Sequence, residues 1–483
     1  MTGSNDKLID AGSAQLGALI EWALQVRVED IPREALKRAA LGIADDVAVA
    51  ASMQDEPEIR QFHELLLRMG STGEATLFRA GAPRTERHAA AAANALAMTA
   101  SEMDEGFRLA PCRGGLYTVP ALLAEAEARD LPVAQVLRAE VLAYEIISRI
   151  ARAWKASDGP YPRYYSHGRL TALGAAAASA LAWDVDARVF LQALSNAATL
   201  INVTPSNHLF SGALVRNVWP AAGAWSGMMS LRWAQCGIAG LPTSINDVFS
   251  GVLDYVAVPS EFMREIGSEW AVCHTYERIH ACHVFFNAII EAMLQVRARM
   301  GEAPIADVEQ IALNIHPAAL SLVDRAPATT LAARFSVPHV AATALFHGHA
   351  RTAAFSNATL TMSEIDTLRR KVTVAPFDMS TLGTQVSEEK ARPEGAPFAL
   401  PLKGPAAVTI SMRRGATYTA RCIDPPGGHH GTPYAHEVVL DKIDALTADR
   451  HPHYGSSTRE LIELAPRCLE EPWSRFIRGA IGS

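Results

Sequence analysis

The sequence has few cysteines and no run of apolar residues long enough to cross a membrane. Six cysteines stand among 483 residues, mostly far apart, whereas small secreted domains depend on dense disulfide frameworks, so we predict free thiols. The first apolar segment, from Leu16 to Val28, is interrupted by Glu21, Gln25 and Arg27, unlike a signal peptide or a membrane span. We therefore expect a cytoplasmic protein without a membrane partner.

Basic charge is not concentrated anywhere along the chain. There are 44 Lys and Arg residues against 51 Asp and Glu, which gives a formal net charge of -7. Binding to a phosphate backbone needs a strong positive field, and scattered basic residues do not supply one. Nucleic acid is therefore not an expected partner.

Several motifs that identify cofactor and nucleophile sites are missing. The chain has no phosphate loop ending in Gly-Lys-Ser/Thr, no Gly-x-Gly-x-x-Gly after a strand, no His-Glu-x-x-His and no Gly-x-Ser-x-Gly, which argues against nucleotide cofactors and a serine nucleophile. Cysteine and histidine residues are dense from Cys273 to His283, but their spacing fits no standard zinc pattern. We expect no metal and no nucleotide cofactor, and a metal-dependent hydrolase using this group is the alternative.

Length and periodicity predict two domains. A chain of 483 residues exceeds the size at which a single core stops growing, roughly 250 to 300 residues. From Ala11 to about Glu269, Ala/Leu-rich stretches at helical spacing dominate, and strand patterns follow after that point. We predict a fold that is mainly α with an α+β part: residues 1–270 and 445–483 form a helical domain, and residues 271–444 form a smaller α+β domain.

Particular segments carry this prediction. Pro120 to Ile150 indicates a helical hairpin with a break at residues 130–132, and the alanine-rich helix from Thr171 to Ala182 is expected at the centre of the bundle. VEQIALNIH, KVTVAP and AAVTISM are predicted strands, between helices at 284–300 and 337–346. Ser380 to Lys403 is expected to be a long loop. A helix over 459–477 should pack back onto the body through Trp473 and Phe476.

Two polar clusters stand out between the helices. Glu102, Asp104 and Glu105 lie close to Arg108 and Arg113, and carboxylates so crowded rarely all ionise normally, which suits general acid/base chemistry. The alternative is a helix C-terminus with solvated charges.

The second cluster directly precedes the alanine-rich helix. It contains Tyr165 and His167, where helix N-terminal N–H groups favour a bound anion. A plain helix cap is the alternative there.

A longer pattern contains both clusters. Gly73 to Thr76, Ala91 to Leu96, PALLAEAE with AYEIISRI, and LAARFSVPHVAATALFHG together resemble the MmgE/PrpD family, whose members include 2-methylcitrate dehydratase, cis-aconitate decarboxylase and iminodisuccinate epimerase. The resemblance covers nearly the whole chain. It implies a helical domain built from both chain ends, a smaller α+β lid, an active site between them, a homodimer, and no metal or organic cofactor.

The resemblance also assigns positions, most of which have changed identity. Glu102 stands at the first Asp of the family's Asp-x-Asp-Asp motif, with Asp104 and Glu105 following, and Arg113 stands at its His-Pro histidine. The family's second histidine falls on Tyr165, or on His167 two residues later. Two family lysines are matched by Arg216 and Arg278, and a tyrosine by His339.

We therefore expect a cofactor-independent lyase, a decarboxylase or dehydratase, acting on a small anionic polycarboxylate. Arginine stays protonated and binds carboxylates in bidentate fashion, so the predicted substrate-binding residues are Arg113, Arg216, Arg278, Glu105 and His280. The predicted catalytic residues are His167, Tyr165, His339, Glu102 and Asp104. Isomerisation or epimerisation of the same substrate class is the alternative reaction, and a non-catalytic binding protein on this fold is the alternative function.

Overall fold

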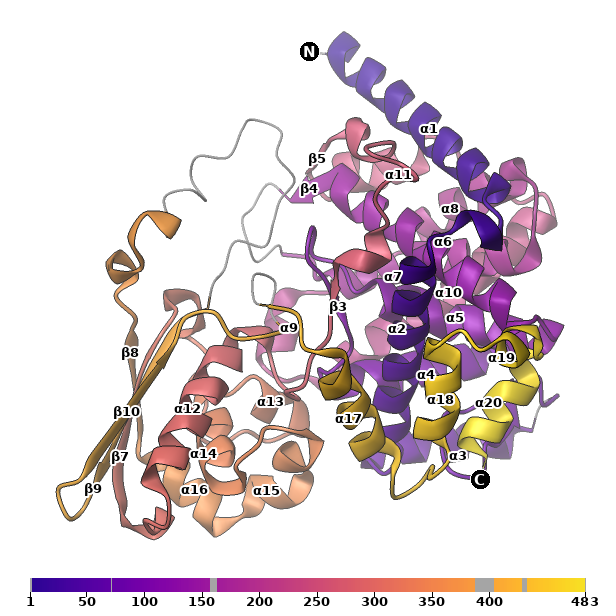
Figure 1. The fold of residues 1–483 in the computed structure, drawn as a ribbon. Helices are drawn as coiled ribbons and strands as arrows, with labels where there is room; N and C mark the ends of the chain where they lie inside the picture. Colours follow the sequence, from indigo (N-terminus) through magenta and orange to yellow (C-terminus); the bar gives the residue numbers. More distant parts are fainter. Residues whose placement is uncertain (1, 71, 157–162, 387–403, 428–431, 483) are drawn as a thin grey trace.

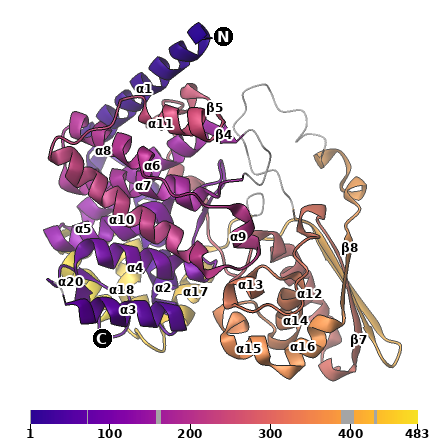
Figure 2. The same ribbon diagram turned by 180° about the vertical axis from the view of Figure 1, so that it is seen from behind.

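The computed structural model describes residues 2–70, 72–156, 163–386, 404–427 and 432–482. Most of the chain is helical, and one four-stranded sheet lies in its C-terminal half. Figures 1 and 2 show the N-terminal helices gathered on one side of the molecule and the sheet with its helices on the other. The predicted fold class, mainly α with an α+β part, is confirmed.

The helical part is built from both ends of the chain. Its N-terminal helices are α1 (Thr2–Gln25), α2 (Arg33–Ser52), α3 (Pro57–Met69), α4 (Arg87–Ala100), α5 (Gly114–Arg129), α6 (Val133–Ala153), α7 (Ser166–Trp183), α8 (Ala187–Thr199), α9 (Ser206–Phe210), α10 (Val218–Gln235) and α11 (Ser244–Asn246). Its C-terminal helices are α17 (His436–Thr447), α18 (Tyr454–Ile462), α19 (Pro466–Glu470) and α20 (Trp473–Ile481). Short two-stranded ladders, β1 (Ala75–Thr76) with β2 (Arg84–Thr85) and β4 (Trp154–Ala156) with β5 (Tyr255–Ala257), connect some of these helices.

The predicted hairpin and central helix are both confirmed. α5 ends where Asp130 adopts a left-handed backbone with φ of 55°, and Pro132 caps the start of α6. α7 is buried from Ser166 to Ala182 and packs against α5, α6, α8 and α10. A Cβ at Gly227 of α10 would lie 2.3 Å from the Ala172 carbonyl oxygen, so the small residues allow these two helices to approach closely.

The C-terminal segment differs from the single helix predicted over 459–477. It forms α18, α19 and α20, because Leu464 takes a left-handed backbone with φ of 54° and prolines open the next two helices. Trp473 and Phe476 are buried in the large helical core, as predicted. The segment thus closes the body that the N-terminus begins.

The α+β part centres on a mixed sheet. Its strand order is β10 (Thr417–Cys422), β9 (Ala406–Met412), β7 (Val308–Ile315), β8 (Val372–Pro376), with β7 and β8 parallel and the other pairs antiparallel. The accompanying helices are α12 (Asn287–Met300), α13 (Thr330–Arg334), α14 (Val337–His347), α15 (Asn357–Thr361) and α16 (Ser363–Arg370). The three predicted strands and two predicted helices are confirmed. β10 was not predicted, because only Ala420 of that strand is buried and the apolar alternation is missing.

Two hydrophobic cores correspond to these parts. One contains residues of α1, α2, α5 to α8 and the C-terminal helices, and the other contains α12, α14 and the inner faces of β7 and β9. We propose that the two domains divide at residues 270 and 445. Helix α17 spans the second of these boundaries and packs on α2 of the helical part. Of the predicted loop at 380–403, residues up to Val386 belong to a 3-10 turn, and residues 387–403 lie outside the described residues.

Candidate active site

A short ladder brings two distant segments to one place. β3 (Gly106–Phe107) pairs antiparallel with β6 (Thr275–Tyr276), with Gly106 opposite Tyr276. A Cβ at Gly106 would lie 2.2 Å from the Tyr276 ring, so the pairing requires glycine at this position. The acidic loop, which we define as residues 102–105 and which precedes β3, therefore lies beside Arg278, two residues after β6.

Buried cations from distant segments hold the backbone of this region. Each donates to one or two carbonyl oxygens at 2.7–3.3 Å: Arg216 to Thr99, Arg334 to Ser101, Lys442 to Met103, and Arg113 to both Asp104 and Glu105. Glu102 itself has a left-handed backbone with φ of 60°, a conformation that costs about 1–3 kcal/mol for a residue other than glycine. The surrounding hydrogen bonds offset that cost and fix where the carboxylates lie.

Glu102 lies between two guanidinium groups. Its side chain is fully buried, as are Arg216 and Arg278. Arg216 pairs with Oε1 of Glu102, and Arg278 Nη2 lies 3.3 Å from Oε2. Burial alone raises the pKa of Glu102, but Arg216 and then Arg278 outweigh it and lower the pKa to about 2. Glu102 is therefore a carboxylate at neutral pH.

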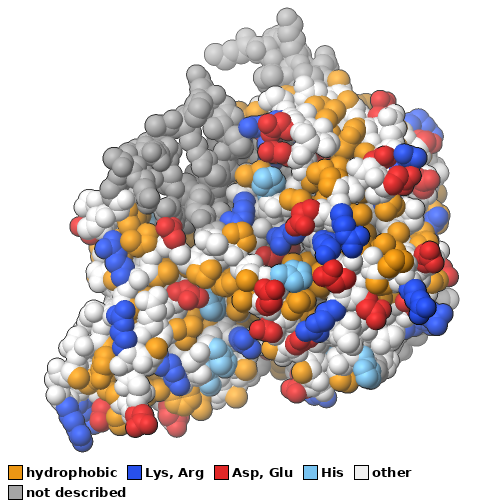
Figure 3. Space-filling model, in the orientation of Figure 1, with side chains coloured by type: hydrophobic (Ala, Val, Ile, Leu, Met, Phe, Trp, Pro, Cys, Tyr) orange, Lys and Arg blue, Asp and Glu red, His pale blue; other side chains and the backbone are white. Residues whose placement is uncertain are grey.

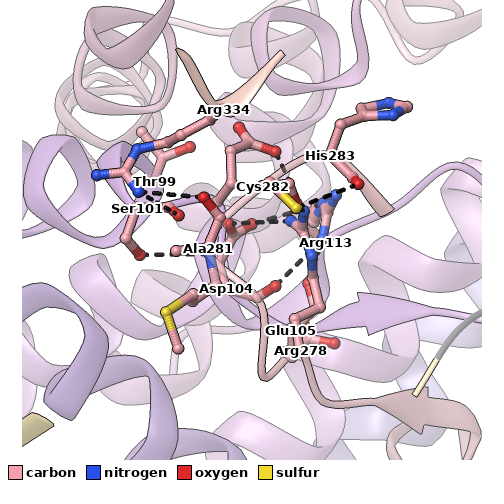
Figure 4. Close-up of polar contacts among 12 residues, drawn as sticks. Thr99, Ser101, Asp104, Glu105, Arg113, Arg278, Ala281, Cys282, His283 and Arg334 are labelled. Atoms are coloured by element: carbon pink, nitrogen blue, oxygen red, sulfur yellow. Dashed lines mark hydrogen bonds and ion pairs between the residues drawn. The ribbon is translucent and has the colours of Figure 1, made fainter. Parts of the chain in front are cut away.

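Asp104 joins the other two predicted arginines. Arg113 Nε lies 3.5 Å from Oδ2 of Asp104, and Arg278 Nη1 lies 3.7 Å from Oδ1. Figure 4 shows Arg113 and Arg278 next to Asp104, with Arg334 beside Thr99 and Ser101. Burial lowers the pKa of Arg113, yet Asp104 and its other neighbours raise it well above its usual value. Arg113 therefore remains a cation.

His167 joins this network through a threonine. Its Nε2 lies 3.5 Å from Thr99 Oγ1, the hydroxyl that also accepts from Arg216, and its Nδ1 lies 3.0 Å from the Tyr117 hydroxyl. Burial, followed by Arg216, lowers the pKa of His167 well below its usual value. The imidazole is therefore neutral at physiological pH.

Tyr165 and His167 are in contact, so the two candidates for the family's second histidine share one location. Tyr165 is the residue before α7, and its ring packs edge-on against the His167 ring with centroids 4.7 Å apart. His167 is fully buried, whereas Tyr165 is partly exposed. The buried imidazole is the group that the polar network includes.

Three other predicted site residues have their polar contacts elsewhere. The Glu105 carboxylate accepts from the Gly115 N–H at 2.7 Å and the Tyr144 hydroxyl at 2.9 Å. His280 Nε2 lies 3.0 Å from Glu291 Oε1, and His339 Nδ1 lies 3.5 Å from Arg369. Burial, then Arg369, lowers the pKa of His339 to about 3. We therefore do not include His280 and His339 in the proposed site.

Sequence reasoning missed Thr99, Arg334 and the position of His283. The Arg334 side chain is fully buried, and its Nε and Nη2 have no hydrogen-bond partner among the residues described. His283 lies among Phe210, Phe285 and Phe335, and burial is the largest cause that lowers its pKa to about 3. Arg334 falls within a motif quoted above, but nothing local in the sequence indicates its contact with residue 101.

Other sequence predictions can be compared directly with the described part of the chain. All six cysteines are free thiols, as predicted. No three metal-ligating side chains gather into a possible metal site among the described residues, those from 273 to 283 included. Over the same residues, every helix is too short or too polar to cross a bilayer. Figure 3 shows Lys and Arg interspersed with Asp and Glu on the face drawn.

Comparison with known proteins gives consistent matches along the chain. The MmgE/PrpD N-terminal domain model matches residues 17–265, and the MmgE/PrpD C-terminal domain model matches residues 280–471. Cis-aconitate decarboxylase of Aspergillus terreus (strain NIH 2624 / FGSC A1156) is 22% identical over 392 residues, which cover 75% of this chain and 79% of that protein. A second cis-aconitate decarboxylase sequence from Aspergillus terreus has the same identity and coverage.

Proposed function

The chain belongs to the MmgE/PrpD family, and from that premise we propose that it is a cofactor-independent lyase, a decarboxylase or dehydratase, acting on a small polycarboxylate. Its distant similarity to cis-aconitate decarboxylase suggests a lyase-type enzyme that acts on carboxylic acids. The finer assignment rests on the buried polar network.

The observation that carries the proposal is an excess of buried positive charge. Three guanidinium groups, from Arg113, Arg216 and Arg278, pair with only two carboxylates, from Glu102 and Asp104. The buried Arg334 also lies in the field of Glu102 and has no ion pair of its own among the described residues. A buried cation without a full set of counter-charges is costly, and a polycarboxylate substrate would provide the missing negative charge. Guanidinium groups suit that role because they bind carboxylates through paired hydrogen bonds.

His167 is the proposed proton carrier. If the Tyr117 hydroxyl donates to Ser166 at 3.0 Å, then the Nδ1–H of His167 donates to Tyr117 and its Nε2 carries a lone pair on the side of Thr99. A neutral imidazole next to buried arginines can take a proton from carbon, and its conjugate acid returns that proton readily. The guanidinium groups would stabilise the carbanion or enediolate charge that develops beside a carboxylate.

Proton exchange in deuterated water tests this proposal. The protein is incubated with methylcitrate, cis-aconitate and related acids, and the recovered acids are analysed by mass spectrometry and NMR. Deuterium in a new product supports the lyase, and deuterium in a stereoisomer without elimination favours the isomerase. A new product without deuterium supports a dehydration, because elimination of water adds no solvent proton to the product. Binding with neither exchange nor a new product in all acids favours the non-catalytic alternative and contradicts the lyase.

We also propose a homodimer, as the family resemblance implies. The outward face of α10 supports this proposal, because Val218 is 44% exposed and Trp225 is 45% exposed on it, while Trp233 packs edge-on against Trp225. A helix with apolar side chains on its outer face is usually covered by a partner. Sedimentation velocity of the purified protein tests it, and a single species at the monomer mass would contradict it.

A further inference from the structure

Another buried carboxylate, that of Asp46, lies next to Glu105 of the acidic loop. Asp46 is on α2 and fully buried, and neither of its carboxylate oxygens has a hydrogen-bond partner among the described residues. A Cβ at Gly115 would lie 2.2 Å from Asp46 Oδ2 and 3.3 Å from Glu105 Oε1. The two carboxylates therefore lie close together beside the backbone of Gly115, which has no side chain to separate them.

The two cations nearest to Asp46 and Glu105 are already paired with other carboxylates. Lys442 Nζ pairs with Asp45 Oδ2 at 2.7 Å, and Arg113 pairs with Asp104. Across the described residues, neither Asp46 nor Glu105 has an ion pair of its own. The titratable and charged groups that face the two carboxylates from surrounding segments are Asp45, Cys112, Arg113, Asp104, Glu140, Tyr144, Tyr276, Lys442 and Tyr454.

Two adjacent buried carboxylates without counter-ions cannot both be charged at low cost. Burial raises the pKa of Glu105 to about 7. Burial, followed by the charge of Glu105, raises the pKa of Asp46 well above its usual range. Hydrogen bonds from the Gly115 N–H and the Tyr144 hydroxyl stabilise the charged form of Glu105. The shared proton therefore resides on Asp46, which donates it in a hydrogen bond to Glu105.

We propose that Asp46 and Glu105 share a proton at neutral pH, and that this carboxyl–carboxylate pair positions the acidic loop. Asp46 is thus a positioning residue, which acts through Glu105 on the neighbouring Asp104 and Arg113. Loss of the proton would add a negative charge behind Arg113 and weaken anion binding in the site. This last consequence rests on the proposed function, whereas the shared proton does not.

The sign of the pH dependence follows from proton binding. The native state binds a proton that the unfolded state releases at the ordinary carboxyl pKa near 4, so stability falls as pH rises from about 4 through 7. Each additional proton held by the native state raises the unfolding equilibrium constant by about tenfold per pH unit across that window. Asp46→Asn keeps a hydrogen-bond donor to Glu105 and removes about one such proton.

The test compares urea unfolding between pH 5 and 7 for the wild type, Asp46→Asn and Glu105→Gln, without any acid ligand. We expect Asp46→Asn to lose about tenfold per pH unit of the wild-type dependence. Glu105→Gln should keep that dependence, because burial is the largest cause that raises the pKa of Asp46 and it does not depend on Glu105. Infrared spectra at pH 7 should show protonated carboxyl absorption in the wild type that weakens in Asp46→Asn, and the absorption that remains belongs to Glu140, whose pKa burial raises well above its usual range. If Asp46→Asn does not fold, Glu105→Gln still tests the proposal, because a retained pH slope and a retained carboxyl band place the proton on Asp46.

Glu125→Gln is the matched control. Glu125 is equally buried but ion-paired with Arg87 and Arg232, so its removal should change stability without changing the pH slope. An unchanged slope in Asp46→Asn, a lost slope in Glu105→Gln, or an unchanged carboxyl band in Asp46→Asn would overturn the shared proton. Because no substrate is present, that outcome would leave the proposed lyase activity untouched, and absence of acid exchange would leave the shared proton untouched.

Discussion

Replacing Arg216 by methionine should destabilise the protein in a manner that depends on pH and on Glu102. In the wild type, lowering the pKa of Glu102 from its usual 4.5 to about 2 corresponds to about 3 kcal/mol of stability. That contribution is present above pH 4.5 and is lost as pH falls through 2. Without Arg216, burial dominates, and the remaining charge on Glu102 becomes a penalty at neutral pH.

We expect Arg216→Met to lose about 3–5 kcal/mol at pH 7.5, the usual cost of breaking a buried pair. The loss should be smaller at pH 5, because the variant's Glu102 binds a proton more readily. Urea unfolding at both pH values measures this difference. A double-mutant cycle with Glu102→Gln should give a coupling energy of about 3 kcal/mol.

Arg149→Met is a suitable control for this experiment. Arg149 is also buried and pairs with Glu145 at 2.6 Å, but it contacts none of the site residues described above. It should lose stability to a similar extent while leaving acid binding unchanged. If the losses from Arg216→Met and Glu102→Gln add to within about 0.5 kcal/mol and do not vary with pH, the reasoning about this ion pair is refuted.

Four other predictions concern chemistry, binding, assembly and the β3–β6 ladder. His167→Gln should lower deuterium exchange by at least about 100-fold while acid affinity by calorimetry changes little; equal exchange would remove His167 from the mechanism. Arg278→Lys keeps the charge but not the planar fork, so its acid affinity should fall less than that of Arg278→Met, and the reverse order would contradict a charge-based site. Trp225→Glu should shift sedimentation toward the monomer, and an unchanged dimer would exclude the α10 face. Gly106→Ala should lower the free energy of unfolding by roughly 1–3 kcal/mol through overpacking against Tyr276. A denaturant midpoint equal to that of the wild type would contradict this expectation, because it would show that the Tyr276 ring can move away at no cost.

Features with local periodicity could be predicted from the sequence. The α5–α6 hairpin follows from apolar spacing interrupted by residues 130–132, and β9 follows from strict alternation in AAVTISM. β10 has no such alternation, and the turn at Leu464 depends on a backbone conformation that its side chain does not indicate. Local patterns therefore predict the elements better than their ends.

The site was predictable to the extent that motifs mark its residues. Glu102, Asp104 and the arginines at 113, 216 and 278 were expected together, and the structure brings them into contact. Arg334 and Thr99 were missed because their partners lie far away in sequence. Asp46 had a signal that could have been used, since two adjacent aspartates interrupt an otherwise apolar stretch of α2.

The central claim is that the buried cluster of Arg113, Arg216 and Arg278 binds a small polycarboxylate and that His167 moves a proton on it. Deuterium incorporation into recovered acid tests this most directly, with wild type, His167→Gln and Arg278→Met compared in deuterated water across the acid panel. The account predicts incorporation into at least one polycarboxylate by the wild type, with little in either variant. Neither incorporation nor a new product from any of the acids with the wild type, or equal incorporation by all three proteins, would contradict it.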